Sequence, residues 1–190
     1  MSGRPDSGSS CTIFLAGFSG SGKSTVGPLV ARRLGVRFYD LDQLIAARAG
    51  MTIGEIFSRQ GEWAFRALED EILAELAGAG RVPSVVALGG GALGRAANRR
   101  LVERSGLLVY LSCSVAELYR RLKDRRDRPL LLVSENPRGG RRRVLLDRIR
   151  GLLAARRSQY ESAAVRVSTS NRTPSATVRL ILEEVRRRHD

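Results

Sequence analysis

The sequence predicts a three-layer α/β fold in which helices cover both faces of a central five-stranded parallel sheet. Two observations support this prediction. Short apolar runs alternate with longer stretches of helical periodicity. The chain has 190 residues, which suffices for one sizeable core and is short for two domains. We therefore expect one domain over residues 11–190, after a disordered polar segment at residues 1–10.

The five apolar runs are the predicted strands. They lie at residues 12–16, 36–39, 84–88, 107–111 and 165–167. The last predicted helix begins at the turn that contains Pro174, and its apolar stripe includes Val178 and Ile181. Between the fourth and fifth runs, residues 124–143 combine charges with Asp, Asn, Pro and a Gly-Gly pair. This composition predicts a mobile surface loop.

Composition narrows the class of protein. The formal net charge is +14, but nearly all of the basic excess is arginine. These arginines are scattered and lack the interleaved aromatic residues of proteins that bind single strands, so we expect no nucleic-acid partner.

Cys11 and Cys113 adjoin β-like runs without metal-ligand spacing, which predicts buried free thiols. No stretch approaches the length of a membrane span, and no signal-like segment is present. We expect a cytoplasmic protein, monomeric and without a membrane partner.

The segment at residues 17–25, which reads GFSGSGKST, is the most specific motif. It fits G-x-x-x-x-G-K-[ST] and lies between a predicted strand and a predicted helix, the context of a phosphate-binding P-loop. Its backbone N–H groups can converge on phosphate oxygens at a helix N-terminus. The residues expected to contact ATP here are Gly20, Ser21, Gly22, Lys23, Ser24 and Thr25. Lys23 can reach the β- and γ-phosphates, and Ser24 can bind Mg²⁺.

Two carboxylates end the second predicted strand. Asp40 and Asp42 lie at the carboxyl edge of the sheet, where the P-loop also lies. If the strand continues through both residues, their side chains point the same way and can face the phosphates. In the alternative interpretation, Asp42 caps the helix that begins at Gln43. An acidic pair at this edge suits Mg²⁺ and hydroxyl chemistry.

A charged helix and a glycine run follow. Glu62, Arg66 and Glu69 have helical spacings that let two carboxylates hold one arginine, although such residues also form solvated ladders on helix surfaces. Gly89, Gly90 and Gly91 come directly after the third predicted strand. They would let a ligand approach the backbone closely, or they could form a tight turn.

Taken together, these motifs resemble those of the shikimate kinase family. The order is GFSGSGKST, D-L-D, G-E-x-x-F-R-x-x-E, L-G-G-G-A and R-P-L-L, and the resemblance extends over roughly residues 11–185. It implies a P-loop kinase fold with a mobile lid at about residues 124–143. It also implies transfer of the γ-phosphate of ATP to the 3-hydroxyl of shikimate, with Mg²⁺ as the metal.

The resemblance also implies roles for individual residues. The catalytic residues would be Lys23, Asp42 and Arg128, the last in the lid. The residues that bind shikimate would be Asp42, Arg66, Gly89, Gly90, Gly91 and Arg156. The arginines that bind ATP would be Arg121, Arg128 and Arg172, of which the first and last would sandwich adenine with Pro174 closing the loop. Ser24 and Asp40 would hold the metal ion, Asp40 through water.

Some alternatives stay open at this point. Ser158 stands where the family usually has proline, so Arg157 competes with Arg156 for the role of second carboxylate-binding arginine. The segment after Arg128 is longer than usual in the family. Another small-molecule P-loop kinase, such as a gluconate or nucleoside monophosphate kinase, is a rival function. A nucleotide-binding regulatory protein without phosphotransfer is another.

Overall fold

The computed structural model has one sheet of five parallel strands in the order β2-β3-β1-β4-β5, and it describes residues 11–78, 82–124 and 140–188. The strands are β1 (Thr12–Ala16), β2 (Arg37–Asp40), β3 (Ser84–Ala87), β4 (Gly106–Ser112) and β5 (Val165–Ser168). All five predicted strands are present, with ends displaced by one residue at most. The predicted fold class is therefore confirmed.

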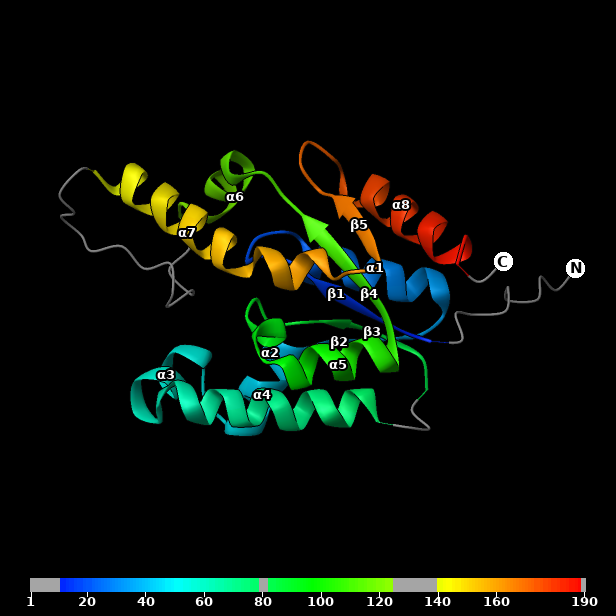
Figure 1. Ribbon diagram of the computed structural model, residues 1–190, viewed down its shortest axis with the longest axis horizontal. Coiled ribbons are helices and arrows are strands. Elements are labelled where there is room, and N and C mark those ends of the chain that lie inside the picture. The colour runs from blue at the N-terminus through cyan, green and yellow to red at the C-terminus, as the bar shows by residue number, and fades with distance from the viewer. Residues whose placement is uncertain (1–10, 79–81, 125–139, 189–190) are drawn as a thin grey trace, which may run out of the picture.

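The helices lie between and beyond these strands (Figure 1). They are α1 (Lys23–Leu34), α2 (Leu41–Ala49), α3 (Ile53–Arg59), α4 (Gly61–Ala77), the 3₁₀ turn η1 (Ala92–Gly94), α5 (Ala96–Ser105), α6 (Val115–Leu122), α7 (Arg141–Glu161) and α8 (Pro174–Arg186). The predicted start of the last helix is correct, because Pro174 opens α8 behind the capping hydroxyl of Thr173.

The two faces of the sheet carry separate cores because side chains alternate along each strand. Ile13 and Leu15 of β1 pack with α1 and α8 on one face. Phe14 and Ala16 pack with α2, α4 and α5 on the other. Figure 1 shows these helix layers on opposite sides of the sheet. A third cluster, around Phe18, joins α6 to α7 beside the P-loop.

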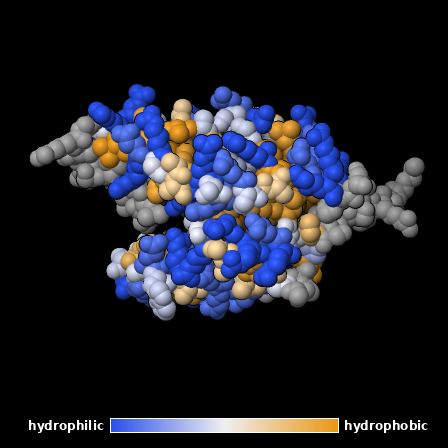
Figure 2. All heavy atoms as spheres, viewed as in Figure 1, coloured by the Kyte–Doolittle hydropathy of each residue, from blue (hydrophilic) through white to orange (hydrophobic). Residues whose placement is uncertain are grey.

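The face seen in Figure 2 is largely hydrophilic, and it is hollowed between the part that contains α7 and the part that contains α3 and α4. Among the described residues, no helix has both the length and the apolar composition needed to cross a membrane. Neither Cys11 nor Cys113 forms a disulfide, as predicted, but both are only half-buried. The expectation that they are buried was wrong because each lies just outside a strand, at the end of the sheet.

Candidate active site

Two adjoining cavities lie at the carboxyl edge of the sheet. The larger, of about 800 Å³, is lined by the P-loop and by α6, α8 and the turn before α8. The smaller, of about 100 Å³, lies among α3, α4, α7 and the residues that follow β3. Ser19, Asp42 and Gly90 line both cavities. The structure therefore offers two compartments with a common wall.

The P-loop forms one side of the larger cavity. Gly20 and Gly22 have φ angles of 80° and 103°, a left-handed conformation that favours glycine. Helix α1 starts at Lys23 behind Gly22, which has no side chain to cap the first N–H groups, so these groups are available to an anion. The Nζ atom of Lys23 donates to the carbonyls of Gly17 (2.7 Å) and Phe18 (3.3 Å). All six predicted P-loop contact residues line this cavity.

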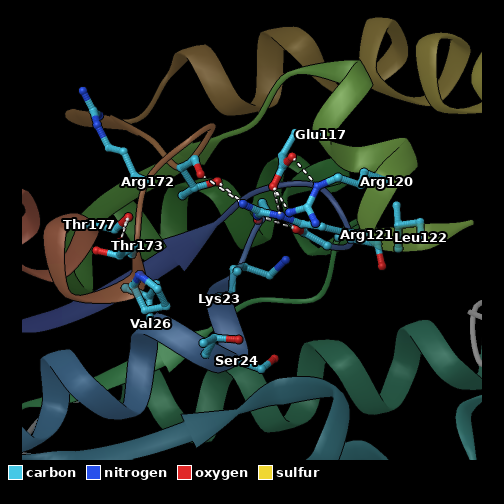
Figure 3. Close-up of a pocket in the computed structure, with 18 of the residues that line it drawn as sticks. Lys23, Ser24, Val26, Glu117, Arg120, Arg121, Leu122, Arg172, Thr173 and Thr177 are labelled. Carbon is cyan, nitrogen blue, oxygen red and sulfur yellow. Dashed lines mark hydrogen bonds and ion pairs between the residues drawn. The ribbon is translucent and has the colours of Figure 1, made fainter.

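Ser24 and Asp40 are directly joined. The hydroxyl of Ser24 donates to Oδ2 of Asp40 at 2.6 Å (Figure 3 labels Ser24). The other oxygen of Asp40 accepts from the backbone N–H groups of Asp42 (3.1 Å) and Gln43 (3.4 Å). The residue that caps the second helix is therefore Asp40, and the alternative in which Asp42 caps it is wrong.

Asp42 lies at the site, but a helix positions its side chain, and not the strand that was expected. Strand β2 ends at Asp40, and Asp42 lies in the first turn of α2, so the alternation of a strand does not align the two side chains. Both residues nevertheless line the larger cavity, and Asp42 alone of the two also lines the smaller one. The helix turn places the carboxylate of Asp42 at the junction of the two compartments.

The glycine run is explained by close contacts with charged side chains. A Cβ placed at Gly89 would lie 2.8 Å from Oε1 of Glu69 and 2.9 Å from Oδ1 of Asp42. At Gly90 it would lie 3.0 Å from Nη1 of Arg156. At Gly91 it would lie 2.9 Å and 3.0 Å from the two terminal nitrogens of Arg66. None of the three glycines has a positive φ. They are needed for space, and each adjoins a different part of the charged wall.

Arg66 is held by two carboxylates, as the spacing predicted. Its Nη1 donates to Glu69 at 2.6 Å, and its Nε and Nη2 donate to Glu62 at 3.2 Å and 3.1 Å. The side chain of Glu69 is only 1% exposed, so this is not a solvated ladder. Burial raises the pKa of Glu69, although Arg66 opposes the shift. Burial lowers the pKa of Arg66, but the two carboxylates outweigh it and the net shift is upward.

Of the two candidate arginines of α7, one lines the smaller cavity and the other is exposed to solvent. Arg156 lines the smaller cavity, with its guanidinium 5.8 Å from the centroid of the Phe18 ring. Arg157 is 78% exposed and pairs with Glu161 at 2.6 Å. A helix turns neighbouring residues to different directions, so only one of the two can face the cavity. The geometry favours Arg156.

Arg121 and Arg172 both line the larger cavity. Arg121 donates to the carbonyls of Gly20 and Thr169, each at 3.0 Å, and pairs with Glu117 at 2.8 Å. Arg172 donates to the carbonyl of Ser168 at 2.9 Å. In Figure 3 its guanidinium is directed away from Arg121. Thus both arginines are at the cavity, but in this structure they do not face each other across it.

Arg128 lies outside the described residues, together with most of the predicted lid. Of the range 124–143, only Asp124 and the residues from Gly140 onward are described. Arg141, Arg142 and Arg143 form the first turn of α7.

Sequence reasoning missed several residues of the site. Glu117 lies under both Arg120 and Arg121, and hydrogen bonds from Arg120 and then Arg121 lower its pKa to about 2, against the effect of burial. Its spacing of three and four residues from these arginines was a usable signal. Other missed wall residues include Ile53, Phe57, Leu152 and Thr169, which gave no comparable local signal.

Side chains of α7 and α5 also hold the backbone at the glycine run by hydrogen bonds. The hydroxyl of Tyr160 donates to the carbonyl of Gly90 at 2.9 Å. The side-chain amide of buried Asn98 donates to the carbonyl of Ala92 at 3.1 Å and to Asp70 at 2.8 Å. The chain from Gly90 to Ala92 is therefore fixed on one side by α7 and on the other by α5.

Comparisons with known proteins agree on one family. The family model described as shikimate kinase matches residues 19–186. Curated shikimate kinases from Chlorobium luteolum and Geobacter sulfurreducens are 45% and 44% identical to this chain over 175 residues. These alignments cover 92% of this chain and 85% and 90% of the relatives.

Solved structures give the same result. A shikimate kinase from Acinetobacter baumannii in complex with shikimate has a TM-score of 0.83 and 34% identity, covering 92% of each chain. That from Aquifex aeolicus has a TM-score of 0.76 and 34% identity, covering 92% of this chain and 96% of the other. A gluconokinase from Sinorhizobium meliloti, with a TM-score of 0.56 and 22% identity, shares the fold only.

Proposed function

This chain belongs to the shikimate kinase family, and from that premise we propose how its two cavities divide the reaction. The protein is an ATP-dependent phosphotransferase that transfers the γ-phosphate of ATP to the 3-hydroxyl of shikimate. We assign ATP to the larger cavity and shikimate to the smaller one. The observation that carries the assignment is the common wall, since Ser19, Asp42 and Gly90 line both compartments. Donor and acceptor would meet there.

The larger cavity has the groups that triphosphate binding requires. Backbone N–H groups at the start of α1 and the ammonium group of Lys23 would hold the phosphate oxygens. In the structure Lys23 rests on the carbonyls of its own loop, so it would exchange these contacts for phosphate oxygens. Arg121, held in place by Glu117, would pack against the base.

Mg²⁺ is part of the proposal, and Ser24 and Asp40 fit it. The hydroxyl and carboxylate oxygens lie 2.6 Å apart, and oxygen donors are those that this ion prefers. Among the described residues, no three His, Cys, Asp or Glu side chains form a metal cluster, so phosphate oxygens and water would supply the remaining ligands. When bound, the ion would neutralise charge on the phosphates.

The smaller cavity has the groups that a hydroxylated carboxylic acid requires. Arg66 and Arg156 would bind the carboxylate, because a planar guanidinium can make two parallel hydrogen bonds to it. Phe57 and Phe65 provide an apolar wall for the ring carbons. The backbone of the glycine run would contact ring hydroxyls.

Asp42 would act on the acceptor. Its carboxylate would orient the 3-hydroxyl and take its proton as the hydroxyl oxygen bonds to the γ-phosphorus and the bond to the bridging oxygen of ADP breaks. Positioning supplies most of the rate in such reactions. Arg128 would complete the phosphate site, a role that follows from the resemblance of its R-P-L-L motif to that of the family.

We also propose that the protein acts as a cytoplasmic monomer without a nucleic-acid partner. Its two cysteines are not joined in a disulfide, as is usual in a reducing compartment. In the described part of the chain, the exposed large hydrophobic residues are Trp63 and Val82, which do not amount to an apolar interface. Many arginines pair with carboxylates of the same surface, as Arg48 does with Glu71 and Glu75.

One assay tests the function. ADP release is coupled to a spectroscopic readout while shikimate, gluconate and nucleoside monophosphates are offered separately. We expect that, of the three kinds of acceptor, only shikimate supports ADP release from ATP. Comparable turnover with gluconate or a nucleoside monophosphate would contradict the assignment of the smaller cavity.

A further inference from the structure

Tyr160 stands behind the wall of the smaller cavity. It is 3% exposed and lies near the end of α7, one turn after Arg156. Its hydroxyl donates to the carbonyl of Gly90 at 2.9 Å, across 70 residues of sequence. A tertiary hydrogen bond therefore joins the helix that carries Arg156 to the glycine run.

The same phenol also lies within the electrostatic influence of Arg156. The charge of Arg156 lowers the pKa of the phenol, against the larger effect of burial, and a Cβ on Gly90 would lie only 3.0 Å from Nη1 of Arg156. The carbonyl of Gly90, the phenol and the guanidinium thus form one packed group. Two of its three members line the cavity.

The ring of Tyr160 is itself fixed to the sheet. It stacks on the ring of Tyr110 in β4, with centroids 4.8 Å apart and planes 14° from parallel. The guanidinium of Arg166 in β5 lies 5.6 Å from the centroid of the Tyr110 ring. Burial raises the pKa of Tyr160 to about 12, so the phenol keeps its proton and remains a donor at neutral pH.

We propose that Tyr160 is a positioning residue of the acceptor cavity, whose phenol holds the carbonyl of Gly90 and the guanidinium of Arg156 in their binding arrangement before shikimate arrives. This inference rests on the proposed function, because it takes the smaller cavity as the shikimate site. Groups that are already ordered need not lose freedom on binding, which favours affinity. Gly90 lines both cavities, whereas Arg156 lines the smaller one and not the larger, so the phenol should influence acceptor binding more than phosphoryl transfer.

The test is Tyr160→Phe, which removes the hydroxyl and keeps the stacked ring. We expect the KM for shikimate to rise about 3- to 30-fold, the range for loss of one buried hydrogen bond that leaves its carbonyl unpaired. The KM for ATP and kcat should stay within about twofold. Tyr110→Phe is the matched control, because it removes a hydroxyl from the other ring of the same stack. It should leave all three constants unchanged.

Three results would overturn the proposal. An unchanged KM for shikimate in Tyr160→Phe would show that the hydroxyl positions nothing. Equal increases in the KM of both substrates would indicate a merely structural role. An equal effect of Tyr110→Phe would assign the result to the ring stack. If the wild-type protein does not phosphorylate shikimate, the proposed function fails as well, so the two failures are distinguishable.

A double-mutant cycle tests the route through Arg156. Arg156→Lys, Tyr160→Phe and the double variant are compared by shikimate KM and by calorimetric shikimate affinity. If the phenol acts partly through Arg156, the double variant should weaken binding by clearly less than the product of the two single effects. A result equal to the product would overturn the role of the phenol in positioning Arg156.

Discussion

Asp42 and Glu69, on separate helices, each place a carboxylate oxygen within 3 Å of the point where a side chain would begin at Gly89. The charge of Asp42 is one of the causes that raise the pKa of buried Glu69. Two carboxylates are therefore packed against one backbone position, and Arg66 is the cation that pairs with Glu69. This packing leaves no room for a methyl group at Gly89.

Gly89→Ala should disable the enzyme without unfolding it. The new Cβ would displace the carboxylate of Asp42 or of Glu69, and misplacement of a reacting group by about 1 Å can cost about 100-fold in rate. We expect kcat/KM for shikimate to fall by about that factor, as measured in the coupled ADP assay. The matched control is Gly151→Ala within α7, where a Cβ meets nothing within 4 Å. It should keep full activity and melt at the same or a higher temperature.

Asp42→Asn should abolish turnover while the affinity for ATP is nearly preserved. An amide can keep the contacts of the side chain but cannot take the hydroxyl proton, and loss of such a group costs about 10² to 10⁴ in rate. Single-turnover kinetics and calorimetry with a non-hydrolysable ATP analogue measure the two properties. An unchanged kcat would remove Asp42 from the reaction.

Arg66→Lys should weaken shikimate binding by more than about tenfold, or about 1.4 kcal/mol. The ammonium group keeps the charge but cannot reproduce the fork of the guanidinium towards a carboxylate. Calorimetric titration with shikimate gives the affinity directly. A smaller loss would exclude a bidentate contact.

Arg156→Lys should raise the KM for shikimate for the same reason, and Arg157→Lys should not. The two residues are neighbours on α7, but Arg157 points to solvent and pairs with Glu161. The pair is therefore a matched comparison. Equal KM values for the two variants would mean that the orientation of α7 does not select the binding residue.

Glu117 should stabilise the protein in a way that depends on pH. Its pKa falls from an ordinary 4.5 to about 2 in the folded state. The folded protein therefore binds this proton less readily than the unfolded chain, and the stabilisation is complete above about pH 4.5 and lost as the pH falls towards 2. Glu117→Gln should cost about 1–2 kcal/mol at pH 7, allowing for the exposure of Arg120.

Thermal unfolding at a series of pH values measures the stabilisation by Glu117. The difference in Tm between wild type and Glu117→Gln should shrink as the pH falls below about 4.5. Glu183→Gln on α8 is the control, since its carboxylate lies 3.8 Å from Arg179 on the exposed surface. A constant difference across the pH range would contradict the role of the Glu117 charge.

Features that depend on residues close together in the sequence were predicted correctly. The five strands follow from apolar runs, and the pairing of Arg66 with two carboxylates follows from helical spacing. The P-loop follows from its glycines and from the strand and helix beside it. In these cases the interacting residues lie within a few positions of one another.

Long-range relationships were not predictable in this way. The strand that ends at Asp40 leaves Asp42 in a helix, because the oxygen of Asp40 captures the first free N–H groups of α2. The links from Tyr160 to Gly90 and from Asn98 to Asp70 join residues that are distant in sequence. Their partners are fixed only when α7 and α5 pack against the sheet. The neighbours of each glycine at 89–91 depend on the same packing.

The wall shared by the two cavities has a consequence for inhibition. Because Ser19, Asp42 and Gly90 line both compartments, molecules bound in the two cavities would lie next to each other. Joining an adenosine phosphate to a cyclic hydroxy acid through a short linker makes the second binding event intramolecular, so the affinities of the two parts reinforce each other. We expect such a bisubstrate compound to discriminate this enzyme from other P-loop kinases, since its acid end would bind the guanidinium groups of Arg66 and Arg156 in the proposed shikimate site.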